Sequence, residues 1–363
     1  MIKVAFISNN LIYGGIERFY INYLNNYDFK EEYEIDIIYS GKSDEEIVNQ
    51  FSSCGVNIIK LEYGLDNKIK YLHELTRLFK KNKYDVIHCN LMQNDFIPLY
   101  AGLKAHVKKR ISHAHMDMSM KYDGNKKSIF NRLGRRIRVR LASILANKKI
   151  ACSEEAGKKA FGKNFTIIYD AINIENFKYD EQVRKSIRKT LGYKPHDHVY
   201  GFVGRLNNNK NPQHAIKVFE AIEELDKSSR FLIIGDGDLK DEISSMINKK
   251  SKYKMIDPVE NISDYYSGMD VLIYPSYTEG LGMVSIEAQC TGLPVVASDN
   301  VPRTTKISNY INYLPLKDDV NTWAQVLISY SSCKREDIVY NNNYSNYDIK
   351  EKACELFDIY NNK

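Results

Sequence analysis

Short apolar runs rich in β-branched residues alternate with longer segments of helical periodicity along the whole chain. In the segment 67–81, large apolar residues recur at near-helical spacing, namely Ile69, Leu72, Leu75, Leu78 and Phe79. Strands that alternate with helices form a parallel sheet whose two faces are covered by the helices. The chain is therefore predicted to be an α/β protein.

The strand-like runs fall into two sets. The first extends from "IKVAFIS" at 2–8 to "FTIIY" at 165–169, and the second from "VYGFVGRL" at 199–206 to "LPVVAS" at 293–298. The stretch between them, 173–198, is polar and charged with little strand character, and 363 residues are enough for two domains. We expect two Rossmann-like domains, 1–172 and 173–345, with a C-terminal helix at 346–363 that completes the first.

The composition restricts the compartment. The six cysteines form no CxxC pair or regular framework, which indicates free thiols in a reducing environment. The N-terminal run "MIKVAFISNN" is typical of a buried first strand rather than a signal peptide, and no apolar stretch approaches the roughly 20 residues of a spanning helix. We expect a cytoplasmic protein.

One segment carries the basic character of the chain. Residues 126–149 contain nine Lys and Arg and no Asp or Glu, so with a net charge of +6 the remainder carries −3. Seven apolar residues fall on one helical stripe: Ile129, Phe130, Leu133, Ile137, Leu141, Ile144 and Leu145. We expect this stripe to pack against the first sheet and leave the arginines to meet the anionic inner face of a membrane. No nucleic-acid recognition motif accompanies these charges.

Each half opens with a strand, a glycine-bearing loop and a helix. Gly14 and Gly15 lie in the first such loop and Gly204 in the second. This unit presents backbone N–H groups to an anion. Two of them facing one another would hold a ligand between the domains.

Two glutamates lie eight positions apart in "YPSYTEGLGMVSIEAQC". Glu279 is expected in a loop after a strand, and Glu287 inside a helix that begins near Gly282. The start of such a helix suits phosphate, and a carboxylate one or two turns into it suits vicinal hydroxyls. The alternative is a simple glycine turn with two solvated glutamates.

Two cations follow the first strand of the second half. Arg205 and Lys210 stand in "GRLNNNK" with no acidic residue between them. Fixed cations beside a glycine can neutralise a departing diphosphate without a metal. The alternative is a pair of surface cations.

Taken in order, these motifs resemble the retaining glycosyltransferases of the GT-B fold, the glycogen-synthase-like group called family four. "EGLGMVSIEA" is similar to the family's E-x7-E element, "GRLNNNK" to its Arg and Lys pair, and "GGIERF" to its N-terminal glycine loop. "IIGDGDLKDEI" and "IIYDAIN" resemble two further family segments, and the likeness covers nearly the whole chain.

The resemblance assigns roles to matching residues. It implies that Arg205 and Lys210 bind the donor diphosphate, Glu287 the ribose and Glu279 the transferred sugar. It also implies donor contacts along a set of loop residues: Gly204, Gly280, Leu281, Gly282 and Met283. Gly14 and Gly15 would bring the N-terminal loop against the donor diphosphate or the acceptor.

The family's histidine corresponds best to His115, with His113 as the rival, and it would contact the sugar or the attacking hydroxyl. His88 is interpreted as structural or as lining the ligand site.

The chain departs from the family at two places. Asp170 and Ala171 replace the usual Asn-Gly, and "VPRTTKISNYIN" replaces a Gly-rich segment that bears a glutamate. The first departure removes a tight glycine conformation, and the second leaves the contacts to the donor base open. The variation resembles the subgroup that makes bacterial exopolysaccharide and capsule.

Other site chemistries fit the sequence less well. "GDGDLK" lacks the third glycine of a dinucleotide fingerprint. Asp236 and Asp238 have the D-x-D spacing of metal-dependent transferases, but we interpret them as loop residues and expect neither a metal nor another cofactor.

The sequence therefore predicts a cytoplasmic glycosyltransferase, peripheral at the inner face of the membrane. It would transfer a sugar from a nucleotide sugar, with a UDP-sugar favoured, to a lipid-linked oligosaccharide. The alternatives are a GT-B nucleotide-sugar epimerase and a non-catalytic nucleotide-sugar-binding protein.

Overall fold

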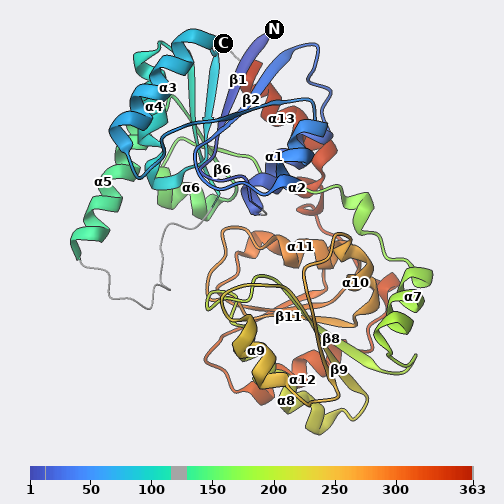
Figure 1. The fold of residues 1–363 in the computed structure, drawn as a ribbon. Helices are drawn as coiled ribbons and strands as arrows, with labels where there is room; N and C mark the ends of the chain where they lie inside the picture. The colour runs from blue at the N-terminus through green and yellow to red at the C-terminus, as the bar shows by residue number, and fades with distance from the viewer. Residues whose placement is uncertain (13, 116–128, 362–363) are drawn as a thin grey trace. The chain divides into compact units, whose positions relative to one another are not determined.

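A computed structural model describes residues 1–12, 14–115 and 129–361, with side chains from residue 133 onward in the last range. It divides into two compact units, Met1–Ile172 with Asn346–Lys363, and Asn173–Ser345 (Figure 1). No helix in the described part of the chain combines the length and apolar character that a membrane span needs.

The first unit is built on a seven-stranded parallel sheet in the order β3-β2-β1-β4-β5-β6-β7. Its strands are β1 (Ile2–Ile7), β2 (Tyr33–Tyr39), β3 (Asn57–Lys60), β4 (Val86–Cys89), β5 (Lys109–Ala114), β6 (Lys148–Ala151) and β7 (Thr166–Ile167). Its α-helices are α1 (Gly15–Asn25), α2 (Glu45–Ser53), α3 (Lys68–Asn82), α4 (Phe96–Lys104), α5 (Ile129–Leu145), α6 (Glu154–Phe161) and α13 (Ile349–Asn361).

The second unit has a six-stranded parallel sheet in the order β10-β9-β8-β11-β12-β13. Its strands are β8 (His198–Val203), β9 (Ser229–Ile234), β10 (Tyr253–Ile256), β11 (Val271–Tyr274), β12 (Val295–Ser298) and β13 (Ile311–Leu314). Its α-helices are α7 (Glu181–Leu191), α8 (Pro212–Leu225), α9 (Lys240–Ile247), α10 (Ile262–Gly268), α11 (Met283–Cys290) and α12 (Val320–Tyr330).

Both sheets reverse their strand order at one point. In the first unit β1 lies between β2 and β4, and in the second β8 lies between β9 and β11. The loops that follow the two central strands diverge at such a point, which leaves a crevice at the carboxyl ends of the strands. These ends are where site residues are expected in each unit.

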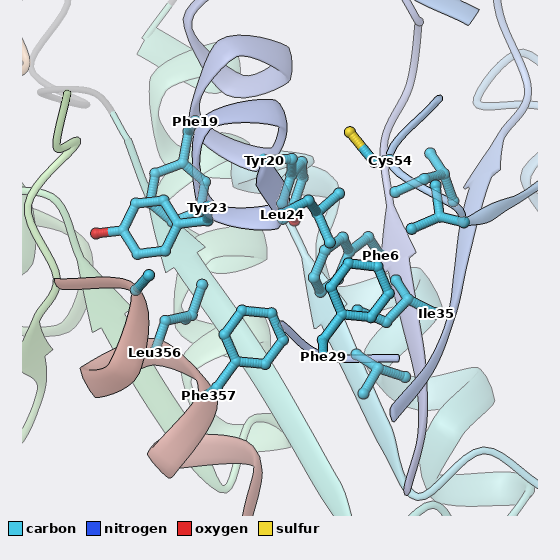
Figure 2. Close-up of a cluster of buried hydrophobic side chains, with 14 of the residues drawn as sticks. Phe6, Phe19, Tyr20, Tyr23, Leu24, Phe29, Ile35, Cys54, Leu356 and Phe357 are labelled. Atoms are coloured by element: carbon cyan, nitrogen blue, oxygen red, sulfur yellow. The ribbon is translucent and has the colours of Figure 1, made fainter. Parts of the chain in front are cut away.

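The C-terminal helix α13 belongs to the first unit. Figure 2 shows Leu356 and Phe357 of α13 in the same apolar cluster as Phe6 and Phe29. The ring of Phe357 stacks on Tyr27 with centroids 4.1 Å apart. Helix α13 therefore helps to close the core around β1 and β2.

Helix α5 buries a different face from the one predicted. Four residues of the expected core stripe are exposed, at 54, 52, 42 and 69% for Leu133, Ile137, Leu141 and Ile144. The helix packs instead through Ala142, Leu145 and, just beyond its end, Ala146. Small side chains allow its backbone to approach α4 closely, so the large apolar residues are left outside. The side chains of Ile129, Phe130 and Arg132 lie outside the described residues.

Candidate functional site

Two loops at the switch point of the second unit carry most of the predicted site. One follows β8 and contains Gly204, Arg205 and Lys210, and the other follows β11 and contains Glu279. Asn209 joins them: its side-chain amide donates to the carbonyl of Thr278 at 2.8 Å, and its own carbonyl accepts from the N–H of Tyr277 at 2.8 Å. The loops are thus held at a fixed register.

The loop connection brings Lys210 and Glu279 into direct contact. Nζ of Lys210 lies 2.6 Å from Oε1 of Glu279 and 3.4 Å from the hydroxyl oxygen of Tyr274. The two ionic side chains are only 20% and 9% exposed. A largely buried ion pair of this kind offers a cation to a phosphate and leaves carboxylate lone pairs for sugar hydroxyls.

Arg205 is the second predicted cation. Its side chain is exposed, and within the described residues it forms no hydrogen bond or ion pair. An arginine in that state can bind a phosphate through two parallel N–H groups without first breaking a contact within the protein.

Glycines bring two backbones together beside these cations. Gly235 has φ of +158°, and a Cβ there would lie 2.0 Å from the carbonyl oxygen of Gly204. At Gly204, by contrast, a Cβ would meet only the Lys210 side chain, at 3.9 Å. A side chain at Gly235 would therefore clash with the backbone of Gly204. At Gly204 there is space next to Lys210.

Helix α11 begins directly after the second loop. Gly282 precedes it in the left-handed conformation, with φ of +94°, and Ser285 N–H donates to its carbonyl at 3.0 Å. Leu281 is buried while Gly280 and Met283 are partly exposed. The amides of the first turn of a helix carry partial positive charge, which favours an anion at this end.

Glu287 lies inside α11 and is almost fully buried, at 2% exposure. Its Oε2 accepts a hydrogen bond from the hydroxyl of Tyr266 at 3.0 Å. This partner belongs to α10, and nothing in the sequence pattern identified it. The bond fixes the direction of the carboxylate that is predicted to bind a ribose.

The predicted histidine lies at the carboxyl end of the first sheet, directly after β5, the strand beside β4. Nδ1 of His115 is 3.1 Å from Oδ1 of Asp170, and Nε2 is 2.8 Å from Oδ1 of Asn90. Both ring nitrogens therefore have protein partners, and the side chain is 4% exposed. Asp170, at 17%, is the more accessible member of the pair.

The rival histidine belongs to a buried chain of polar groups. His113 Nδ1 lies 3.0 Å from Nε2 of His88, whose Nδ1 lies 2.7 Å from the hydroxyl of Tyr360 in α13. Burial lowers the pKa of both His88 and His113 well below the usual histidine value, so both are neutral. The pair packs beside the predicted histidine, because the His113 ring contacts that of His115 with centroids 3.8 Å apart.

Gly14 and Gly15 begin helix α1. A Cβ on Gly15 would meet open space, whereas one on Gly14 would lie 2.7 Å from a carboxylate oxygen of Glu17. Glu17 is 8% exposed, and burial raises its pKa. Sequence reasoning missed this glutamate, and its signal was its position in the first turn after the glycines.

The D-x-D pair has a local role in the loop after β9. Asp236 is 58% exposed and pairs with Lys240 at 3.4 Å, and Asp238 is exposed. Within the described ranges, no three His, Cys, Asp or Glu side chains form a group that could hold a metal ion.

The chain is similar to several known glycosyltransferases. Residues 183–342 match the family described as "Glycosyl transferases group 1". The putative glycosyltransferase EpsF of Bacillus subtilis is 26% identical over 381 residues, which cover 99% of this chain and 96% of EpsF. An Escherichia coli protein named UDP-Gal:alpha-D-GlcNAc-diphosphoundecaprenol alpha-1,3-galactosyltransferase is 22% identical over 379 residues, with 99% and 96% covered.

Solved structures share the fold over the whole chain. HepE of Anabaena, crystallised with UDP and glucose, is similar with a TM-score of 0.80 at 16% identity, and 100% of each chain is covered. Sucrose-phosphate synthase of Thermosynechococcus elongatus has a TM-score of 0.74 at 16% identity, with 99% of this chain and 98% of that chain covered.

Proposed function

Because the chain is a group 1 glycosyltransferase with the GT-B fold, we propose that it transfers a sugar from a UDP-sugar to a hydroxyl of a lipid-linked oligosaccharide. The anomeric configuration is retained, as in the family four enzymes that the chain resembles. The observation that carries the donor assignment is the Lys210–Glu279 pair beside the open face of Gly204.

The chemistry of a nucleotide sugar matches the groups at this point. Cleavage of its glycosidic bond leaves negative charge on a diphosphate. Lys210, which pairs with Glu279 in the loop before α11, and Arg205, from the same loop as Lys210, would supply two cations. Donors and cations fixed before the reaction stabilise such developing charge without reorganisation. Glu279 then receives hydroxyls of the sugar, and Glu287 those of the ribose.

The names of relatives support the finer assignment. The Escherichia coli relative is named for UDP-galactose and an undecaprenol diphosphate acceptor, and a Staphylococcus aureus relative for capsular polysaccharide biosynthesis. HepE was crystallised with UDP-glucose as well as with UDP. These names favour uridine in the donor and a polyprenyl diphosphate in the acceptor.

A lipid-linked acceptor requires the enzyme to work at a membrane surface, and α5 fits that role. Its exposed residues alternate in kind, with Leu133, Ile137 and Leu141 beside Arg136 and Arg140. Tyr100 and Leu103 of α4, the helix that packs against α5, are also exposed. The arginines would meet anionic head groups while the apolar side chains enter the interface. We place this contact on the cytoplasmic leaflet, where four buried free cysteines would stay reduced.

Liposome sedimentation tests the membrane contact. Binding should require anionic lipid and weaken as salt rises. The double variant Arg136→Gln with Arg140→Gln should weaken binding about thirtyfold, from about 1 kcal/mol per basic residue. A matched variant, Lys80→Gln with Lys81→Gln on α3, removes the same charge from exposed positions of the same unit and should bind normally. Equal loss in both variants would remove α5 from the proposal.

A ligand screen by thermal stabilisation tests the donor assignment. UDP and UDP-sugars should raise the melting temperature more than ADP or GDP, because a ligand at 100 times its dissociation constant stabilises the folded state by about 2.7 kcal/mol. Arg205→Ala should reduce the rise in melting temperature. Lys189→Ala, at an exposed position of α7, should not. Equal shifts with all nucleotides would contradict uridine recognition.

A further inference from the structure

Tyr274 is the last residue of β11 and the last before the loop that carries Glu279. Its side chain is 1% exposed, although it stands at the carboxyl end of the sheet where the predicted donor residues gather. The residue is not one of the motif positions. Because Tyr274 is buried at this point, we expect it to fix the position of the neighbouring donor-site residues.

The contacts of Tyr274 converge on the ion pair. Its hydroxyl accepts a hydrogen bond from Nζ of Lys210 at 3.4 Å, and the same nitrogen lies 5.4 Å from the centroid of its ring. Burial raises the pKa of Tyr274 well above its usual value, and the nearby Glu279 carboxylate adds to this shift. The hydroxyl is therefore a neutral dipole between a cation and an anion.

The ring also lies close to the start of α11. A Cβ built on Gly282 would lie 3.6 Å from Cε1 of Tyr274. One buried side chain thus contacts the lysine of the loop after β8 and lies beside the turn that begins α11. These are the two elements that carry the predicted diphosphate contacts.

Such support has a physical purpose for a lysine. The ammonium group sits on a flexible four-carbon stem whose freedom amounts to about 2 kcal/mol of rotamer entropy. Fixing it before the ligand arrives lowers the entropy lost on binding. It also keeps a cation beside Glu279, whose carboxylate would otherwise repel a diphosphate.

We propose that Tyr274 is a positioning residue that holds Lys210 against Glu279 through its hydroxyl and ring, and so sets the affinity for the donor diphosphate. This inference rests on the proposed donor site. A residue that only packs in the core would affect stability, whereas Tyr274 should also affect the affinity for the ligand.

Substitution separates the hydroxyl from the ring. Tyr274→Phe keeps the volume and the cation–π contact, so the protein should keep its melting temperature while the dissociation constant of UDP rises about tenfold. Tyr274→Leu also removes the aromatic face and should raise it by about a further threefold. Tyr193→Phe is the matched control. Tyr193 lies before β8, and its buried hydroxyl has no hydrogen-bond partner in the described part of the chain.

A double-mutant cycle on UDP binding by calorimetry decides the inference. In a Lys210→Met background, Tyr274→Phe should have no further effect, because the hydroxyl acts through the lysine. An unchanged dissociation constant in the single variant, or an equal change in both backgrounds, would overturn the inference. UDP binding by the wild type would still support the proposed donor site. If the wild type bound no UDP, the proposed function would fail and the inference with it.

Discussion

Nζ of Lys210 lies 2.6 Å from Oε1 of Glu279, so the cation assigned to the diphosphate and the carboxylate assigned to the sugar contact each other directly. The two residues come from loops 69 positions apart in the sequence. Because each holds the other in place, their contributions to transfer should be coupled.

We therefore predict that Lys210→Met and Glu279→Gln each lower kcat/KM by roughly 30- to 1,000-fold, as expected for loss of a charged contact in the transition state. The double variant should lose far less than the product of the two factors. Steady-state kinetics with all four proteins measures the coupling. Strictly multiplicative losses would show that the two residues act independently.

Arg205 should matter for activity and not for stability. Its side chain is exposed and forms no hydrogen bond or ion pair with any described residue. Arg205→Ala should therefore leave the melting temperature unchanged. It should lower kcat/KM, because about 2–4 kcal/mol of transition-state stabilisation is lost. Calorimetry and donor kinetics on the same preparation check both halves. Near-normal kcat/KM would show that Arg205 does not bind the diphosphate.

Glu287 should affect both properties, because Glu287→Ala leaves the buried hydroxyl of Tyr266 without this partner. We expect a loss of about 1–3 kcal/mol in unfolding free energy together with a large fall in kcat/KM. Tyr266→Phe removes the donor alone and should cost less stability and only part of the activity. A Glu287→Ala protein with normal kcat/KM would contradict ribose binding by this residue.

Asp95 gives a pH-dependent prediction for the first unit. Burial raises its pKa from 3.8 to about 7, while Ser112 and the N–H of Leu91 donate hydrogen bonds to it. Between pH 3.8 and about pH 7, the folded chain therefore keeps a proton on Asp95 that the unfolded chain releases. The stabilisation from this group is complete below the unfolded pKa and is lost as pH rises through the folded pKa.

The measurement is urea unfolding of wild type and Asp95→Asn, with hydrogen exchange in β4 and β5 reporting on the first unit. The unfolding free energy of wild type relative to the variant should fall by about 1.4 kcal/mol per pH unit between about pH 5 and pH 6.5. The buried histidines titrate with the opposite sign, but they are common to both proteins and cancel. A pH-independent difference would mean that Asp95 has an ordinary pKa.

Metal independence is a further prediction. Lys240 already pairs with Asp236 and Asp257, at 3.4 Å and 2.5 Å, and Lys210 and Arg205 are assigned the role of a divalent cation at the diphosphate. Transfer should survive exhaustive chelation. Complete loss with EDTA and recovery with manganese would assign a metal to Asp236 and Asp238.

The sequence predicted the α/β fold class correctly, because strand and helix periodicities are local properties. The glycosyltransferase family is also confirmed. The orientation of α5 was predicted wrongly. A stripe of Leu133, Ile137, Leu141 and Ile144 has the pattern of a core face, but the close contact through Ala142 and Ala146 determines which side is buried.

The partners of the site residues could not be predicted in the same way. Tyr266, Asn90 and Asp170 meet Glu287 and His115 only after the sheets form, at separations of 21, 25 and 55 positions. No periodicity encodes such a pairing. The partial exposure of Asp170 beside His115 was likewise invisible in the sequence, where Asp170 was only a departure from the family pattern.

A transfer assay with UDP-sugars and a polyprenyl-diphosphate-linked saccharide, followed by NMR of the product, tests the proposed reaction most directly. A retaining transferase should release UDP only when the acceptor is present and should form a new glycosidic bond with the anomeric configuration of the donor. Release of UDP with an altered free sugar and no need for an acceptor would contradict transfer and identify a nucleotide-sugar epimerase instead.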